Sequence, residues 1–217
     1  MPKLYYTPSS CGASSFISAY IAKLNFECEA VDLATHITES GIDFYSINPK
    51  GNVPSLVLDD GTVLNENISC LNYIADRALE NGVALAPKIG SNERYVLDQQ
   101  LSFLSSELHS TIGMLFNPST KNDDYLRNFV MSIFDRKMKY LQKHILNQNR
   151  KFVYGNSFTI IDAYLHIILS WTYYVNIDLS KYPVAHKYFE GICNIQEVKN
   201  SKKRMADIPS TIWRINN

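Results

Sequence analysis

The spacing of hydrophobic residues predicts that the chain begins with a strand, a helix and a second strand. Residues 3–6 form a short β-prone run, and residues 26–33 form another, with apolar side chains on one face. Between them, apolar residues recur at helical spacing from position 16 to position 24. One helix of this length between two strands predicts a βαβ unit with a right-handed crossover.

A β-hairpin and a further helix complete the predicted first part. Asp60 and Gly61 lie between two β-prone runs, which is a strong hairpin signal. Residues 39–48 are weakly helical and end before Pro49, because proline cannot continue a helix. Beyond the hairpin, apolar residues between positions 68 and 75 share one helical face. The first eighty residues therefore predict the order β-α-β-α-β-β-α.

The pattern changes to helices alone after residues 81–90, which contain two glycines and a proline without a clear period and predict a linker. Leucine and isoleucine then step by three or four positions from 97 to 115, which predicts a long amphipathic helix. The further predicted helices begin near Asp124, at Thr159, at Pro183 and near position 195. We therefore expect an α/β domain at 1–80, the linker, and an all-helical domain at 91–217.

Composition narrows the class of protein. Hydrophobic residues make up 46% of the 217 positions and charged residues 19%, as in ordinary globular proteins. Lysine plus arginine and aspartate plus glutamate are equal at 21 each, which argues against a nucleic-acid binder. Apolar runs are too short to span a membrane, and the first strand follows the N-terminus without an apolar segment, so we expect no secretory signal. The four separated cysteines lack zinc-ligand spacing, so we expect no metal and a cytoplasmic protein with free thiols.

Cys11 is the first candidate for chemistry, because it follows a strand and a Thr-Pro-Ser-Ser turn and precedes a helix. The unpaired N–H groups and the positive dipole end at a helix start favour an anion. A thiolate there can have a pKa below the value of about 8.5 that free cysteine has. Two interpretations stay open: a reactive or hydrogen-bonding thiol, and a buried residue in a strand–helix corner.

For three other segments, the sequence also leaves both a structural and a functional interpretation open. The stretch from Asn48 to Pro54 is either a loop entering the hairpin or a backbone edge, held open by Pro54, that an extended peptide can join at Val53. Glu66, ahead of a helix, is either a cap or a ligand for an ammonium group. His109 is a lone histidine on a helix, either packed or catalytic. Tyr6, near the end of the first strand, is a weaker candidate for a sulfur partner.

The sequence Thr159-x-x-Asp162 is a near match to the helix capping box, with Asp in place of the usual Glu. Its residues satisfy backbone groups at a helix start, so we interpret it as structural.

Taken together, these residues resemble the beta-class, cysteine-type bacterial glutathione transferases over nearly the full chain. Many motifs in the right order are more specific than any one of them. The matching pieces are Lys3-Leu4-Tyr5-Tyr6-Thr7-Pro8-x-Ser10-Cys11, Thr38-Glu39-Ser40-Gly41, Ile47-Asn48-Pro49-Lys50-Gly51-Asn52-Val53-Pro54, Leu64-x-Glu66, Glu93-Arg94-Tyr95, Glu107-x-His109 and Phe158-Thr159-x-x-Asp162-Ala163-Tyr164-Leu165.

The resemblance implies a thioredoxin-like N-terminal domain, an all-α C-terminal domain, glutathione as co-substrate and a homodimer. It implies that Pro54 is cis and that Val53 pairs with the cysteinyl backbone of glutathione. The other residues that the resemblance places at glutathione are Cys11 and His109 as catalytic residues, Glu66 and Asn67 at the γ-glutamyl end, His36 near the glycine carboxylate, Ser106 beside the sulfur, and Ser102 facing the glutathione of the partner subunit.

The chain departs from the family pattern at three places. Cys11-Gly12-Ala13 replaces the common Cys-Ser-Leu, and Ser110 stands where a lysine is common. His36 replaces a lysine, so glutathione binding is expected to weaken above the pKa of this histidine.

Two functions follow as hypotheses. In the first, the protein is an enzyme in which the glutathione thiolate attacks a small electrophile or reduces a peroxide or disulfide. Cys11 then either donates a hydrogen bond to the glutathione sulfur or forms a mixed disulfide with it. In the second, the protein is a glutathione-transferase-like module that binds ligands or partners without turnover.

Overall fold

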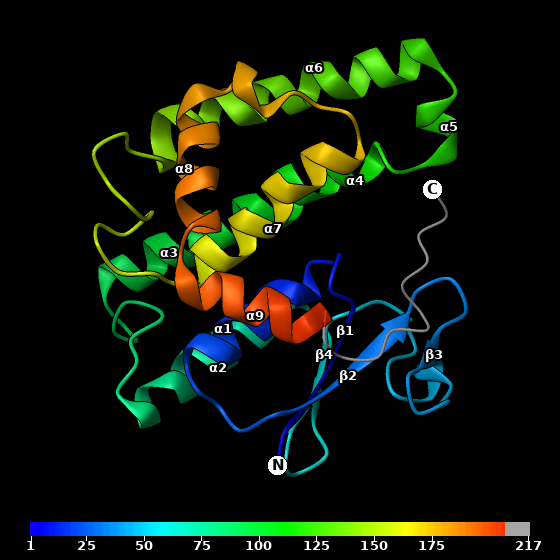
Figure 1. Cartoon of the computed structure of the whole chain (residues 1–217), viewed down its shortest axis with the longest axis vertical. Coiled ribbons are helices and arrows are strands. Elements are labelled where there is room, and N and C mark those ends of the chain that lie inside the picture. Colours follow the sequence, from blue (N-terminus) through cyan, green and yellow to red (C-terminus); the bar gives the residue numbers. More distant parts are fainter. Residues whose placement is uncertain (207–217) are drawn as a thin grey trace. The chain divides into compact units, whose positions relative to one another are not determined.

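The structure, a computed structural model, describes residues 1–206 and divides into two compact units (Figure 1). The first contains residues 1–85 and, of the described chain, 195–206; the second contains residues 86–194. The tail with Pro209 and Trp213, for which the pattern predicts nothing, lies outside the described residues.

In the described part of the first unit, five strands form one mixed sheet in the order β3-β2-β1-β4-β5. The central strand β1 is parallel to β2 and antiparallel to β4, with Leu4 opposite both Cys28 and Leu56. The elements are β1 (Lys3–Tyr6), α1 (Gly12–Ile21), β2 (Glu27–Asp32), β3 (Ile37–Thr38), β4 (Ser55–Val57), β5 (Val63–Leu64) and α2 (Asn67–Ala78). The predicted βαβ unit, hairpin and following helix are confirmed. The weak helix expected at 39–48 is only a 3-10 turn, Phe44–Ser46.

The core of the first unit lies on both faces of the sheet. Successive side chains of a strand point to opposite faces. Tyr5 therefore joins a buried cluster with Phe44 and Val53, while Tyr6 stacks on Phe16 of α1 at 4.9 Å between ring centroids. The alternation of β1 thus fixes α1 against the sheet, with Cys11 at the end of α1 that follows the strand.

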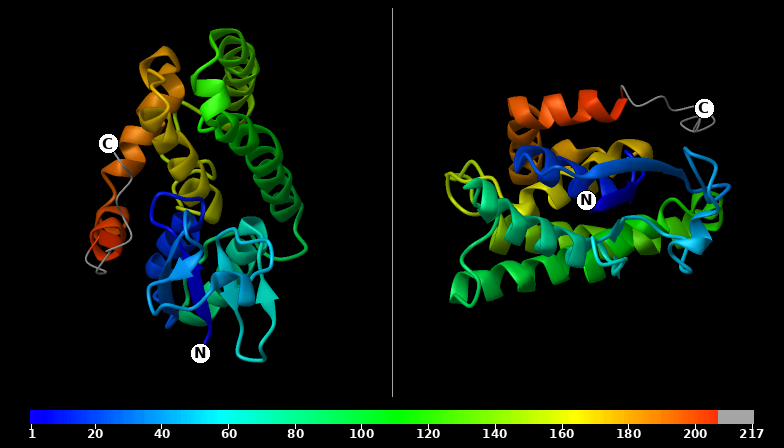
Figure 2. Two further views of the ribbon diagram at one scale, coloured as in Figure 1. Left: turned by 90° about the vertical axis from the view of Figure 1, so that its right-hand side faces the viewer. Right: turned by 90° about the horizontal axis from the view of Figure 1, so that it is seen from below.

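The last described helix, α9 (Gln196–Ala206), belongs to the first unit, although the sequence pattern assigned it to the helical domain at 91–217. It packs against α1, beside which it runs in Figures 1 and 2. Val198, Ser201 and Met205 are buried along this contact face. Chain order suggested that α9 packs on the helices that precede it. Its stripe of buried residues is instead covered by α1.

The second unit is all-helical, as predicted. Its long first helix runs through α3 (Asn92–Phe103), a π-helical segment (Leu104–His109) and α4 (Ser110–Met114). The predicted stripe from Leu97 to Leu115 is fully buried. The remaining helices are α5 (Pro118–Lys121), α6 (Asp124–Tyr140) with a π-helical end (Leu141–Ile145), α7 (Ile160–Tyr174), a 3-10 turn (Leu179–Lys181) and α8 (Pro183–Cys193).

The capping box at the start of α7 is confirmed in a modified form. Asp162 Oδ2 accepts hydrogen bonds from the Thr159 N–H and hydroxyl, each at 2.8 Å. Its Oδ1 accepts from the Val153 N–H at 2.9 Å and from the Tyr188 hydroxyl at 2.7 Å. The buried carboxylate therefore joins α7 to a preceding loop and to α8.

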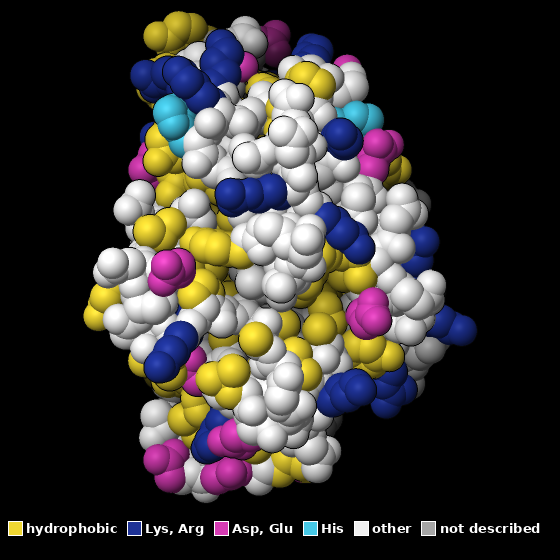
Figure 3. Space-filling model, turned by 90° about the vertical axis from the view of Figure 1, so that its left-hand side faces the viewer, with side chains coloured by type: hydrophobic (Ala, Val, Ile, Leu, Met, Phe, Trp, Pro, Cys, Tyr) yellow, Lys and Arg dark blue, Asp and Glu magenta, His cyan; other side chains and the backbone are white. Residues whose placement is uncertain are grey.

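Charged and apolar side chains are mixed on the face of the molecule drawn in Figure 3. On the face drawn in Figure 3, basic and acidic side chains lie among hydrophobic and neutral ones, with a group of lysine and arginine side chains near the upper end. Every helix within residues 1–206 falls short of the length and apolarity that a membrane span requires. The same residues contain no group of three or more His, Cys, Asp or Glu side chains placed to hold a metal ion.

Candidate functional site

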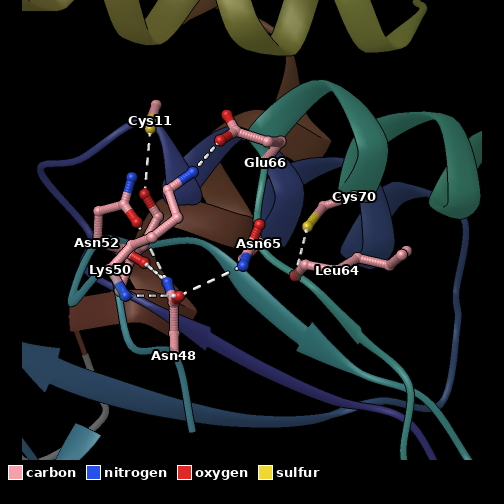
Figure 4. Close-up of polar contacts among 9 residues, drawn as sticks. Cys11, Asn48, Lys50, Asn52, Leu64, Asn65, Glu66 and Cys70 are labelled. Atoms are coloured by element: carbon pink, nitrogen blue, oxygen red, sulfur yellow. Dashed lines mark hydrogen bonds and ion pairs between the residues drawn. The ribbon is translucent and has the colours of Figure 1, made fainter. Parts of the chain in front are cut away.

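Cys11 lies where β1 gives way to α1, as predicted. The Ser10 hydroxyl donates to the Thr7 carbonyl at 2.7 Å and accepts from the Gly12 N–H at 3.1 Å, which closes the turn before the helix. The Cys11 thiol donates to the Val53 carbonyl oxygen, with 3.4 Å between sulfur and oxygen (Figure 4). The thiol therefore lies directly against the backbone that precedes Pro54.

The pKa of the Cys11 thiol is shifted upward, whereas its position at a helix start predicts a downward shift. Burial raises the pKa of its thiol to about 12, and the backbone N–H groups of Cys11 and Gly12 lower it by less. The expectation of a lowered pKa is therefore wrong, because desolvation outweighs the helix start. At neutral pH the thiol is protonated and acts as a hydrogen-bond donor.

The backbone around Val53 has the geometry that the resemblance implies. The Val53-Pro54 peptide bond is cis, and β4 begins at Ser55. Val53 itself is buried beside Tyr5 and Phe44. Its side chain therefore anchors this backbone edge to the core, while its carbonyl faces the thiol of Cys11.

Asn48 begins the stretch that the sequence pattern singled out, without a role of its own there, and it organises the loop that leads to Val53. It is fully buried, and its amide nitrogen donates to the Asn52 carbonyl at 2.7 Å. Its side-chain oxygen accepts from the Lys50 N–H at 3.1 Å and from the Asn65 amide at 3.4 Å. An asparagine directly before a proline is a turn signal that points to such a role.

Glu66 and Asn67 point in different directions at the start of α2. The Glu66 carboxylate is exposed and forms an ion pair with the Lys50 ammonium (Figure 4). The Asn67 side chain is buried, and its oxygen accepts from the hydroxyls of Ser14 at 3.3 Å and Ser15 at 3.1 Å. The Asn67 side chain thus joins α2 to α1. A ligand at this helix start would therefore contact the backbone of Asn67 and not its side chain.

His36 lies in the turn between β2 and β3 and contacts the loop that contains Gly51. Its backbone has a left-handed φ of 55°, and its Nδ1 is 3.0 Å from the Gly51 carbonyl oxygen. Its ring packs on Tyr45 at 4.5 Å between centroids. A Cβ at Gly51, whose φ is 67°, would lie 2.6 Å from Tyr45 and 3.0 Å from His36. Glycine is therefore required for this close approach.

Tyr6 is not available to a ligand sulfur. It is fully buried, its hydroxyl has no hydrogen-bond partner within residues 1–206, and burial raises its pKa.

Three predicted residues belong to the second unit. The hydroxyls of Ser102 and Ser106 donate to the carbonyls of Asp98 and Ser102, each at 2.8 Å, and both serines line a hollow of about 550 Å³. His109 Nδ1 lies 2.7 Å from the Tyr164 hydroxyl, and the His109 ring meets Trp171 edge-on at 4.7 Å. Burial lowers the pKa of His109, so its imidazole is neutral at pH 7.

The chain matches known proteins over almost its full length. The family model described as "Glutathione S-transferase, N-terminal domain" matches residues 3–76. Glutathione S-transferase GstA of Escherichia coli O157:H7 is 32% identical over 199 residues, which cover 92% of this chain and 96% of that protein.

Solved structures agree with this match. A sphingomonad glutathione S-transferase complexed with glutathione is 37% identical, with a TM-score of 0.85 over 94% of this chain and 98% of that one. A bacterial beta-class glutathione S-transferase from Sphingomonas chungbukensis is 35% identical, with a TM-score of 0.84 over the same shares.

These similarities confirm the expected fold of a thioredoxin-like domain followed by a helical domain. They also favour the glutathione transferase hypothesis over the non-catalytic module. The chain belongs to the glutathione S-transferase family.

Proposed function

We propose that this protein is a glutathione transferase of the beta-class, cysteine type. It conjugates glutathione to small electrophiles, or uses it to reduce peroxides or disulfides. One observation carries the proposal: the Cys11 thiol donates a hydrogen bond to the carbonyl of Val53, next to cis-Pro54. A thiol and an open backbone edge are thereby adjacent, as a cysteine-containing peptide substrate requires.

Glutathione binds by extending this edge. The cysteinyl backbone of glutathione pairs with the backbone of Val53, as in other peptides that add to a strand edge. The glutathione sulfur then lies beside Cys11. The Cys11 thiol is protonated at neutral pH, so its one S–H turns from the Val53 carbonyl to the glutathione thiolate and stabilises that charge.

The charged ends of glutathione meet charged and polar groups of the first unit. Glu66 accepts from the γ-glutamyl ammonium, and the backbone N–H of Asn67 at the α2 start donates to the adjoining carboxylate. His36 lies near the glycine carboxylate. Its imidazole already contacts the Gly51 carbonyl at 3.0 Å, so this contact positions the ring.

The remaining roles follow the family resemblance. Residues 1–80 bind glutathione, 81–90 connect them to the helices that follow, and residues 91–194 supply the helical domain, in which the resemblance assigns Ser106 and His109 to the glutathione sulfur. The protein is a cytoplasmic homodimer in which Ser102 faces the glutathione of the partner subunit.

Steady-state turnover of glutathione over a panel of electrophiles, peroxides and disulfides tests this proposal. We expect saturable turnover by the wild type, and a KM for glutathione raised about tenfold in Glu66→Gln with kcat little changed. Glu80→Gln is the matched control, because Glu80 is equally exposed and ion-paired near the other end of α2. Glutathione binding without turnover would establish the non-catalytic module. Absence of calorimetric binding at both pH 6 and pH 8 would exclude both functions.

A further inference from the structure

The ion pair between Lys50 and Glu66 places two opposite charges at the mouth of the proposed glutathione site. Lys50 extends from the loop before Val53, and Glu66 immediately precedes α2 (Figure 4). Their side chains are 48% and 61% exposed. Both charged groups are therefore within reach of a ligand from solvent.

One buried side chain contacts both segments that carry these charges. The Asn48 oxygen accepts from the Lys50 backbone N–H at 3.1 Å and from the Asn65 side-chain amide at 3.4 Å, and Asn65 is the residue before Glu66. Asn48 thus links the backbone of Lys50 to the side chain beside Glu66, while the charged ends of Lys50 and Glu66 extend into solvent. The ion pair between Lys50 and Glu66 can therefore open by side-chain rotation, without a change in the fold.

An α-amino acid group is the chemical complement of this pair. It carries an ammonium and a carboxylate on one carbon, so the two charges are neighbours. An exposed ion pair contributes little to stability, so separating Lys50 from Glu66 is easy. Two ion pairs to the ligand then replace one within the protein.

We propose that Lys50 and Glu66 form a two-charge clamp for the α-amino acid end of the γ-glutamyl group. On binding, the ligand ammonium replaces the Lys50 ammonium at Glu66, and Lys50 turns to the ligand carboxylate. This inference rests on the proposed function and adds to it a residue, Lys50, that specifies a ligand carrying both charges.

Calorimetric titration of Lys50→Gln with two peptides tests the clamp. One peptide is glutathione, and the other has 4-aminobutyryl in place of γ-glutamyl, which retains the ammonium and lacks the α-carboxylate. We expect Lys50→Gln to bind glutathione about fivefold more weakly than the wild type at low salt. The same variant binds the 4-aminobutyryl peptide as well as the wild type or more tightly, because the competing ammonium has been removed.

Arg77→Gln is the matched control, because Arg77 is 47% exposed and paired with Glu80, beyond the far end of α2. It should leave both affinities unchanged. Equal weakening of both peptides by Lys50→Gln, or no change for glutathione, would overturn the clamp while leaving the proposed function intact. Failure of the wild type to bind glutathione would overturn both.

Discussion

Cys11 shows how the chemistry of one residue depends on contacts distant in sequence. Its position before a helix is visible in the sequence, and this position alone predicts an activated thiolate. The Val53 carbonyl, 42 positions away, accepts a hydrogen bond from the thiol. Burial raises the pKa of the Cys11 thiol to about 12. The position of the thiol was therefore predictable from the sequence, but its protonation state was not.

The raised pKa predicts slow alkylation of Cys11 in the absence of glutathione. Only the thiolate reacts, and below the pKa its fraction rises about tenfold per pH unit. We expect iodoacetamide at pH 7.5 to modify Cys11 more than about a hundredfold more slowly than free cysteine, with the rate still rising at pH 10. Peptide mass spectrometry separates Cys11 from Cys28 and Cys70, whose pKa values burial also raises, to about 11 and about 12. Fast modification that levels off near pH 8 would show an ionised thiol instead.

Of the residues at the proposed clamp, only Glu66 could be predicted from the sequence. Glu66 was selected by the resemblance, whereas Lys50 and Asn48 lie inside a matched motif without having been given a role. Their importance comes from the Asn48 oxygen, which joins two loops 17 positions apart. Such a long-range contact leaves no periodic signal in the sequence.

At the scale of elements, strong periodicity gave correct predictions and weak periodicity did not. The buried stripe from Leu97 to Leu115 keeps its helical spacing, so the helix was predictable. Its π-helical segment (Leu104–His109) was not, because a local change in hydrogen bonding barely alters that spacing. β3 (Ile37–Thr38) was also missed, since two residues are too short to show an alternation.

The start of α7 depends on a buried carboxylate that four groups contact. Removing the Thr159 hydroxyl takes one donor away, so Thr159→Ala should lower the free energy of unfolding by about 1 kcal/mol. Asp162→Ala leaves the buried Tyr188 hydroxyl and two N–H groups unpaired, so it should cost about 3 kcal/mol or more. Urea unfolding measures both changes.

Asp123→Ala provides the control for this prediction. Asp123 caps α6 from an exposed position by accepting from the Leu126 N–H at 2.9 Å, so its loss should cost about 1 kcal/mol. Equal costs for Asp123→Ala and Asp162→Ala would show that the buried network adds nothing beyond an ordinary cap.

At the scale of the whole molecule, the order of the two parts was predictable but the assignment of α9 was not. Composition and periodicity separate the mixed first part from the helical second part. The stripe of Val198, Ser201 and Met205 predicts that one side of α9 is buried. It does not predict that α1 is the helix that covers this side. Contacts between elements far apart in the chain decide such assignments.

We expect the full chain to turn over glutathione with the neutral thiol of Cys11 as a hydrogen-bond donor to the glutathione sulfur. The most direct measurement is kcat/KM for glutathione conjugation by the wild type, Cys11→Ser and Cys11→Ala. A hydroxyl preserves the donor, so Cys11→Ser should stay within about threefold of the wild type, whereas Cys11→Ala should lose about tenfold. An equal loss in both variants, with a glutathione adduct on wild-type Cys11 after incubation with glutathione disulfide, would contradict the claim and establish Cys11 as a nucleophile.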